Sequence, residues 1–177
     1  LQVMRASGCA GVLSTLLQSE SLHAIDMFIP DSMSVDEKLL SNSFRSNTTL
    51  RHLFIHGNVN NLVATTLLRE LQHNTTLIEL CMNVGDLPLD LLADMLQSNT
   101  SLQVLRLDYS NCANLDDDEY IAQLEIAVNN HPTLRNFAIT HCGRPMLPSV
   151  SHCVALKRLE TAGLPASVSC TCSVCTS

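Results

Sequence analysis

Apolar residues recur along this chain in the order Leu-x-x-Leu-x-Leu, and the clearest copies follow an Asn-Thr-Thr or Asn-Thr-Ser triplet. Strict and looser copies together begin at Leu1, Leu22, Leu50, Leu77, Leu102, Leu134 and Leu156. In a short strand, side chains at offsets 3 and 5 from the first leucine share one side, and those at offsets 2, 4 and 6 share the other. The pattern therefore predicts repeated strands, with Leu53, Leu80 and Leu105 stacked in one interior ridge.

A second apolar pattern precedes each later copy and predicts a helix. Apolar residues lie ten and six positions before the first leucine, and a separation of four places both on the buried side of a helix. The pairs are Val12 and Leu16, Leu40 and Phe44, Leu67 and Leu71, Leu92 and Leu96, Leu124 and Val128, and Met146 and Val150. Strand and helix in alternation predict a right-handed solenoid with a parallel sheet on its concave side and helices on its convex side.

Polar residues mark the predicted ends of these helices. Asn47, Asn74 and Asn99 each lie three residues before a repeat begins, where asparagine can end a helix in a left-handed conformation. His131, followed by Pro132, takes the fourth equivalent position. The acidic run over 116–119 precedes a predicted helix over 120–129, and we interpret it as favouring the positive end of that helix rather than binding calcium.

The residue at offset 8, where the chain turns after each strand, is Cys9, Asn58 and Cys142 in three copies. With its Leu-x-x-Leu-x-Leu phrases, the chain resembles the ribonuclease-inhibitor-like subfamily of leucine-rich-repeat proteins. That subfamily includes ribonuclease inhibitor, the sensor regions of NOD-like receptors and the activating proteins of the Ran GTPase. The resemblance implies an α/β leucine-rich-repeat solenoid, as a horseshoe fragment. We expect about seven repeats over residues 1–165 and an irregular Ser- and Cys-rich tail over 166–177.

Composition narrows the classes of function. The formal charge of -7 argues against nucleic acid, because binding a polyanion requires clustered Lys and Arg. No apolar run approaches the roughly 18 residues of a membrane span, and the start does not resemble a signal peptide. Because Leu1 falls inside a repeat, we expect the sequence to be a fragment.

The outward side of the predicted sheet is the first candidate site. Its residues at offsets 2, 4 and 6 include aromatic, basic and acidic side chains, types that anchor protein interfaces. The favoured partner-binding residues are His52, Phe54, His56, Arg106 and Asp108. The alternative is an ordinary solvated sheet surface without a partner.

Metal binding has two weaker candidates. His52 and His56 are four residues apart on a strand, about 13 Å, which is too far to share one ion. Cys170, Cys172 and Cys175 form C-x-C-x-x-C, and a zinc site there would need a further ligand from another Cys or His. A tail of free thiols is the favoured interpretation, so no metal and no cofactor is predicted.

The Asn-Thr-Thr phrases raise the question of compartment. Asn47, Asn74 and Asn99 all match the N-glycosylation pattern, which would suggest secretion. They recur at one position of the repeat, however, which indicates a structural purpose. Together with eight apparently unpaired cysteines, this favours a reducing, cytoplasmic environment.

No catalytic motif is present: the sequence lacks G-x-S-x-G, a glycine-rich phosphate loop and H-E-x-x-H. We therefore predict a non-catalytic protein-interaction module with a protein partner, part of a larger intracellular receptor or adaptor. One alternative is an activating regulator of a small GTPase; Arg51, Arg106 and Arg135 are possible on position for its arginine, but no motif selects one and none is assigned. A second is a truncated copy without a function of its own. The oligomeric state stays open.

Overall fold

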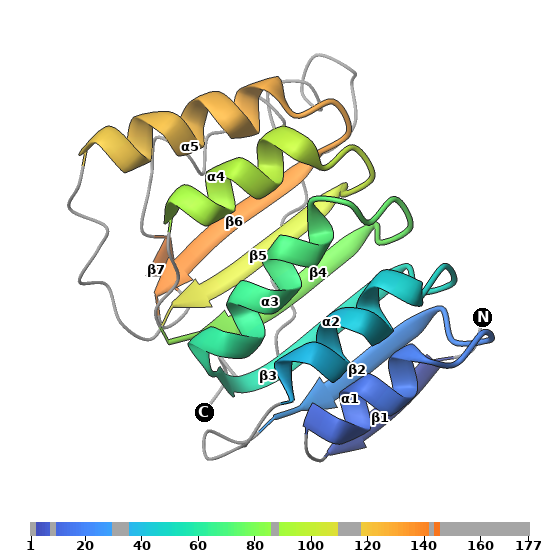
Figure 1. The fold of residues 1–177 in the computed structure, drawn as a ribbon. Coiled ribbons are helices and arrows are strands. Elements are labelled where there is room, and N and C mark those ends of the chain that lie inside the picture. The colour runs from blue at the N-terminus through green and yellow to red at the C-terminus, as the bar shows by residue number, and fades with distance from the viewer. Residues whose placement is uncertain are drawn as a thin grey trace.

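The computed structural model describes residues 3–7, 10–29, 36–85, 89–109, 118–141 and 144–145 (Figure 1). Strands and helices alternate along the chain. The elements are β1 (Val3–Ser7), α1 (Ala10–Leu17), β2 (Ala24–Phe28), α2 (Glu37–Ser46), β3 (His52–Val59), α3 (Asn61–Leu71), β4 (Glu79–Val84), α4 (Leu89–Ser98), β5 (Val104–Tyr109), α5 (Asp118–Asn130), β6 (Asn136–His141) and β7 (Arg144–Pro145).

One sheet contains all seven of these strands, in the order of the chain. Strands β1 to β6 pair in parallel, and β7 pairs antiparallel with β6. Helices α1 to α5 all cover the same side of the sheet, as Figure 1 shows. This arrangement confirms the predicted α/β leucine-rich-repeat solenoid. The copy that begins at Leu156 and the predicted tail lie outside the described residues.

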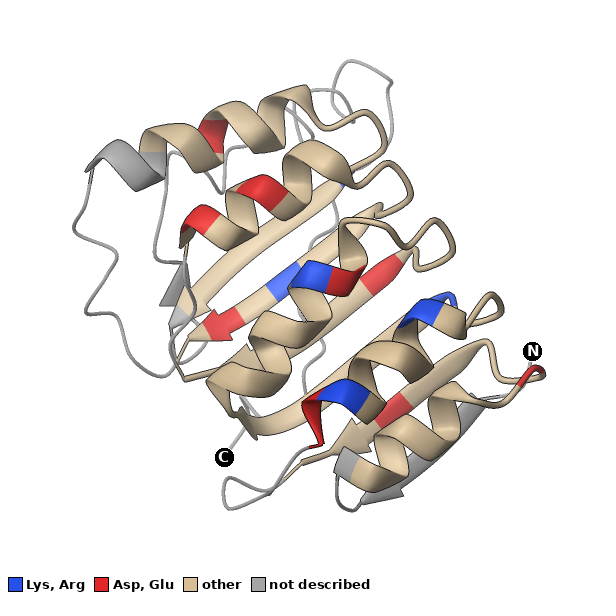
Figure 2. Ribbon diagram, in the orientation of Figure 1, with Lys and Arg blue, Asp and Glu red and all other residues tan. Residues whose placement is uncertain are grey.

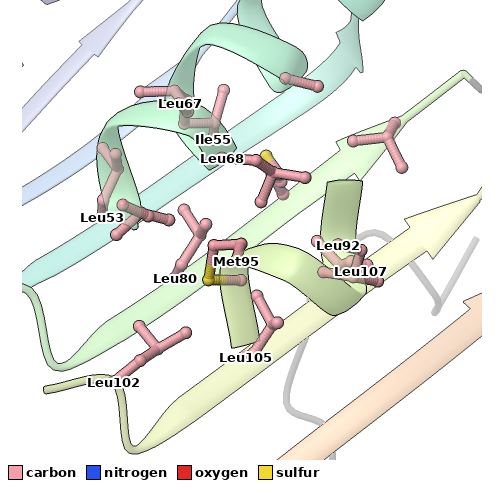
Figure 3. Close-up of a cluster of buried hydrophobic side chains, with 14 of the residues drawn as sticks. Leu53, Ile55, Leu67, Leu68, Leu80, Leu92, Met95, Leu102, Leu105 and Leu107 are labelled. Carbon is pink, nitrogen blue, oxygen red and sulfur yellow. The ribbon is translucent and has the colours of Figure 1, made fainter. Parts of the chain in front are cut away.

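The predicted interior ridge is present. Leu53 pairs with Leu80 and Leu80 with Leu105, and all three side chains are fully buried. Figure 3 shows this ridge together with leucine and methionine side chains of the covering helices. Burying one leucine stabilises the fold by roughly 1.5–3 kcal/mol. The ridge therefore holds neighbouring repeats in register.

The helices bury the predicted stripe in four of the five described cases. The pairs in α2, α3, α4 and α5 are all buried. In α1, however, Leu13 and Leu17 are buried, while Val12 and Leu16 are partly exposed. A spacing of four sets the period of an apolar stripe but not its phase, and neighbouring residues can share one wide face. The pair Met146 and Val150 lies outside the described residues.

The asparagines before the repeats act through their side chains, and Asn47 does not adopt the predicted left-handed backbone. Asn47 is extended, with φ -76° and ψ 123°, so the predicted conformation is wrong there. Its Oδ1 accepts hydrogen bonds from the backbone N–H of Thr49 at 3.1 Å and of Leu50 at 2.7 Å. Its Nδ2 donates to the carbonyl of Leu17, one repeat earlier, at 2.7 Å. The side chain thus closes the turn and joins two repeats.

Asn99 repeats this pattern in the centre of the array. Its Oδ1 accepts from the backbone N–H of Ser101 at 3.0 Å and of Leu102 at 2.8 Å. Its Nδ2 donates to the carbonyls of Leu71 at 2.6 Å and Asn74 at 3.0 Å. Only 1% of the residue is exposed. The Asn-Thr-Ser phrase here, like Asn-Thr-Thr at Asn47, is therefore a structural element of the repeat.

His131 performs the acceptor part of this function in the last described turn. Its Nδ1 lies 3.3 Å from the backbone nitrogen of Thr133 and 3.0 Å from that of Leu134, so it accepts from both N–H groups. The ring is buried, and burial lowers the pKa of His131. Because Nδ1 must be unprotonated to accept, the neutral ring is the form that supports the fold.

Two further details differ from the predictions or extend them. Helix α5 begins at Asp118, so part of the acidic run belongs to its first turn instead of preceding it. Among the described helices, none combines the length and the apolar character that crossing a membrane would require.

Candidate functional site

The side of the sheet opposite the helices carries the candidate site, and we call it the open face. Side chains alternate along a strand, so one residue in two lies on this side and the others pack under the helices. From β2 to β6, the open face consists of Ala24, Asp26 and Phe28; His52, Phe54 and His56; Glu79, Cys81 and Asn83; Val104, Arg106 and Asp108; and Asn136, Ala138 and Thr140.

Exposure on the open face is uneven. Phe28 is 49% exposed, the largest value for an aromatic residue in the described part of the chain. Ala24, predicted to face outward, is only 5% exposed, since a methyl group is easily covered by neighbouring side chains. The remaining open-face residues of β3 to β6 are partly exposed. An exposed aromatic side chain among partly covered polar ones is typical of a surface that binds protein.

The predicted site residues fall into two groups. His52, Phe54 and His56 lie on β3, whereas Arg106 and Asp108 lie on β5. Strand β4 separates the groups, so the structure brings together members within each group but not all five. Neighbouring strands are about 4.8 Å apart, which places the two groups about 10 Å from each other.

Each histidine contacts a carboxylate on a neighbouring strand. His56 Nε2 lies 2.9 Å from Asp26 Oδ1 on β2. His52 Nδ1 lies 3.1 Å from Glu79 Oε2 on β4. These contacts fix both imidazole rings, one on each side of Phe54 along β3. The histidines therefore bridge strands and are not poised as a pair around one ion.

In the second group, Asp108 is also bonded to a neighbouring strand, but Arg106 is not. Thr140 Oγ1 on β6 donates to Asp108 Oδ1 at 2.7 Å. No hydrogen bond or ion pair joins the guanidinium of Arg106 to another residue in the part of the chain that the structure describes. Its neighbours in the adjacent strands are the short side chains of Cys81 and Ala138.

Charge on the open face follows from these positions. Strands β2 to β6 contain three acidic residues, Asp26, Glu79 and Asp108, and Arg106 is their sole Lys or Arg. Figure 2 shows the acidic positions on β2, β4 and β5, and the basic one on β5. Within strands β2 to β6, Arg106 is thus the one Lys or Arg among three acidic residues.

A bulge shapes the end of β3. The register between β3 and β4 shifts between Ile55 and Val59, and Gly57 has φ +91°. A Cβ at Gly57 would lie 2.0 Å from the carbonyl oxygen of Ile29 and 3.3 Å from the ring of Phe28. Glycine is therefore required at this position, and its missing side chain leaves room for Phe28. Asn58, predicted in a turn, lies within β3 because the bulge lets the strand continue to Val59.

The sequence did not indicate the bonds that Asp26 and Thr140 make with the site residues. Both follow from the register: Asp26 lies opposite Phe54, which is two residues before His56 on β3, and Thr140 lies opposite Asp108. Aligning the repeats by their first leucine would have placed Thr140 beside Asp108.

No group of three or more His, Cys, Asp or Glu suited to a metal is found among the described residues. The tail cysteines lie outside them.

Comparisons with known proteins agree with the fold. No protein-family model matches the chain, and no curated protein matches it by sequence. A solved structure titled as the tropomodulin C-terminal domain, from Caenorhabditis elegans, superposes with a TM-score of 0.58 at 15% identity. The superposition covers 87% of this chain and 98% of that one. At this identity the likeness concerns the fold, and it supports the leucine-rich-repeat architecture.

Proposed function

We propose that this chain is a non-catalytic protein-interaction module that binds a protein partner on the open face. The anchors are His52, Phe54, His56, Arg106 and Asp108, with Phe28 beside His56. Repeat solenoids commonly present such extended surfaces to partners, and that part of the proposal is an analogy of architecture.

One observation carries the proposal: the open face holds polar side chains that are fixed by bonds between strands, and an exposed aromatic residue lies on the same face. Asp26 and Glu79 hold His56 and His52, and Thr140 holds Asp108. Side chains that are already ordered lose little conformational entropy when a partner binds. A half-exposed phenylalanine, in contrast, gains by burial. The open face is thus suited to binding a partner without rearrangement.

We further propose a cytoplasmic location within a larger receptor or adaptor of the ribonuclease-inhibitor-like subfamily. The support comes from Asn47 and Asn99, which are 7% and 1% exposed. Each donates its Nδ2, the atom that would carry a glycan, to a carbonyl of the preceding repeat. Glycosylation at either position would break the turn, so the fold suits a compartment without N-glycosylation.

Site-specific photo-crosslinking tests the proposed function. A benzophenone amino acid replaces Phe28 on the open face in one variant, and Ile126 on α5 in the other. Ile126 is 58% exposed, so the control position is at least as accessible. We expect a discrete protein adduct from position 28 that is absent from position 126.

The adduct must also depend on the anchors. Adding Phe54→Ala to the position-28 variant should reduce its yield severalfold, whereas adding Leu62→Ala on α3 should leave it unchanged. Leu62 is an exposed apolar residue on the helical side, which makes it a matched control for lost apolar surface. Identical products from both crosslinking positions, or a yield that all five anchor substitutions leave intact, would refute the proposal.

A further inference from the structure

Arg106 differs from every other charged residue of the open face in β2 to β6. The carboxylates of Asp26, Glu79 and Asp108 each receive a hydrogen bond or histidine contact from a neighbouring strand. The guanidinium of Arg106 has no such bond to any residue in the described ranges. It is nevertheless only partly exposed. A partly covered cation without an internal partner has donors to offer to a bound molecule.

The residues next to Arg106 on the neighbouring strands are small. The residues aligned with it on β4 and β6 are Cys81 and Ala138, both shorter than arginine. Arginine presents five N–H donors in a fixed fork that matches the two oxygens of a carboxylate. A bidentate contact of this kind would complete the hydrogen bonding that the chain itself leaves open.

From this arrangement we infer that Arg106 binds a carboxylate side chain, Asp or Glu, in an extended segment of the protein partner. The inference rests on the proposed function, since it names the chemistry of the partner for the same face. It adds that the partner contributes one acidic residue at a defined place.

The charge around Arg106 limits the occupant to a single carboxylate. Asp108 lies two residues along the same strand, about 7 Å away at ~3.3 Å per residue. Glu79 lies on the neighbouring strand β4. A run of acidic residues, or a dianionic phosphate, would be repelled by these carboxylates, because like charges at such distances cost energy near a protein surface. A partner segment with one carboxylate, flanked by uncharged residues, can pair with Arg106 without this repulsion.

Phe54 sets the position of an apolar side chain of the partner. Phe54 and Arg106 belong to one row, with Cys81 between them. Their strands are therefore separated by about 10 Å, a distance that roughly three extended residues span. The occupant that fits is a segment with an acidic residue and an apolar residue about three positions away.

A set of synthetic peptides tests the inference with the full chain. The peptides share the frame Leu-Ser-Ser-X-Ser-Ser-Leu, in which X is Glu, Gln, Lys or phosphoserine, and binding is measured by fluorescence polarisation up to millimolar protein. We expect the Glu peptide to bind on the order of tenfold to a hundredfold more tightly than the Gln peptide, which is typical of one charged hydrogen-bonded pair.

Variants at Arg106 show whether this preference belongs to that side chain. Arg106→Gln should abolish the preference for Glu, Arg106→Lys should retain part of it, and Arg106→Glu should favour the Lys peptide. The matched control is Arg69→Gln, which removes a cation from the helical side, where Arg69 pairs only weakly with Glu37 at 3.5 Å. Circular dichroism should show that every variant melts like the parent.

The outcomes separate this inference from the proposed function. Equal binding of the Glu and Gln peptides, a preference for phosphoserine or Lys, a preference for Glu that survives Arg106→Gln, or no binding of any peptide would each overturn the role of Arg106. The position-28 crosslink would still stand in those cases if the open face binds a partner by other contacts. Loss of the crosslink with a retained Glu preference would instead refute the proposed function.

Discussion

Replacing Asn99 with alanine should destabilise the array far more than its small size suggests. The side chain makes five hydrogen bonds within the turn and to the preceding repeat, at 2.6, 2.8, 3.0, 3.0 and 3.4 Å, the longest from the hydroxyl of Ser101. Each such bond contributes about 1 kcal/mol net. Alanine would also leave buried N–H and C=O groups without partners, and each unsatisfied group costs roughly 1–3 kcal/mol. We therefore expect Asn99→Ala to lower the free energy of unfolding by about 3–5 kcal/mol.

Urea unfolding followed by circular dichroism at 222 nm measures this loss. The expected change is a large share of the roughly 5–15 kcal/mol that holds a typical domain together. The control is Asn42→Ala, on the exposed side of α2, where alanine favours the helix and the change should stay within about 0.5 kcal/mol. If Asn99→Ala costs less than about 1 kcal/mol, or no more than Asn42→Ala, the structural interpretation of the Asn-Thr-Thr phrase is wrong.

Three further predictions concern stability. Burial lowers the pKa of His131 below its usual 6.5, so below about pH 6.5 the unfolded chain binds more protons than the folded chain. Stability should therefore fall as pH drops below about 6.5, and His131→Asn should flatten that dependence in melting curves measured across pH. Burial tends to raise the pKa of Glu70, but hydrogen bonds from Arg45 and Ser41 outweigh it and lower the pKa below 4.5; stability should therefore also fall as pH drops through the acid range below 4.5, and Glu70→Gln should remove this step from acid titrations of the melting temperature. Gly57→Ala should cost at least about 2 kcal/mol in urea and weaken the position-28 crosslink, because a Cβ would clash with Ile29 and displace Phe28; unchanged stability would contradict the bulge.

The repeat fold could be predicted because its signal is both local and periodic. Leu53, Leu80 and Leu105 occupy the same offset in successive copies, and a strand of period two leaves one side for them. The helix pairs gave the right elements, yet the phase of α1 was wrong because a spacing of four does not say which neighbouring residue faces inward. The turn asparagines were located correctly, but the prediction missed that their side chains close the turn, and the left-handed backbone was wrong for Asn47.

The site was harder to predict than the fold. Placing His52, Phe54 and His56 on one face required only alternation along β3. The contact of His56 with Asp26 depends on the register between two strands 30 residues apart in sequence. The bulge at Gly57 depends on the close approach of the Ile29 carbonyl, and the sequence contains no local sign of that contact.

The most direct test of the register beneath the open face is a methyl NOE measurement. With leucine methyl groups labelled, the structure predicts cross-peaks between Leu53 and Leu80 and between Leu80 and Leu105, and none directly between Leu53 and Leu105. Leu53 and Leu80 lie in adjacent strands, as do Leu80 and Leu105, and all three side chains are fully buried. If either neighbouring cross-peak is absent in a folded sample, the strands are not in this register, and the open face does not hold the residues assigned to it.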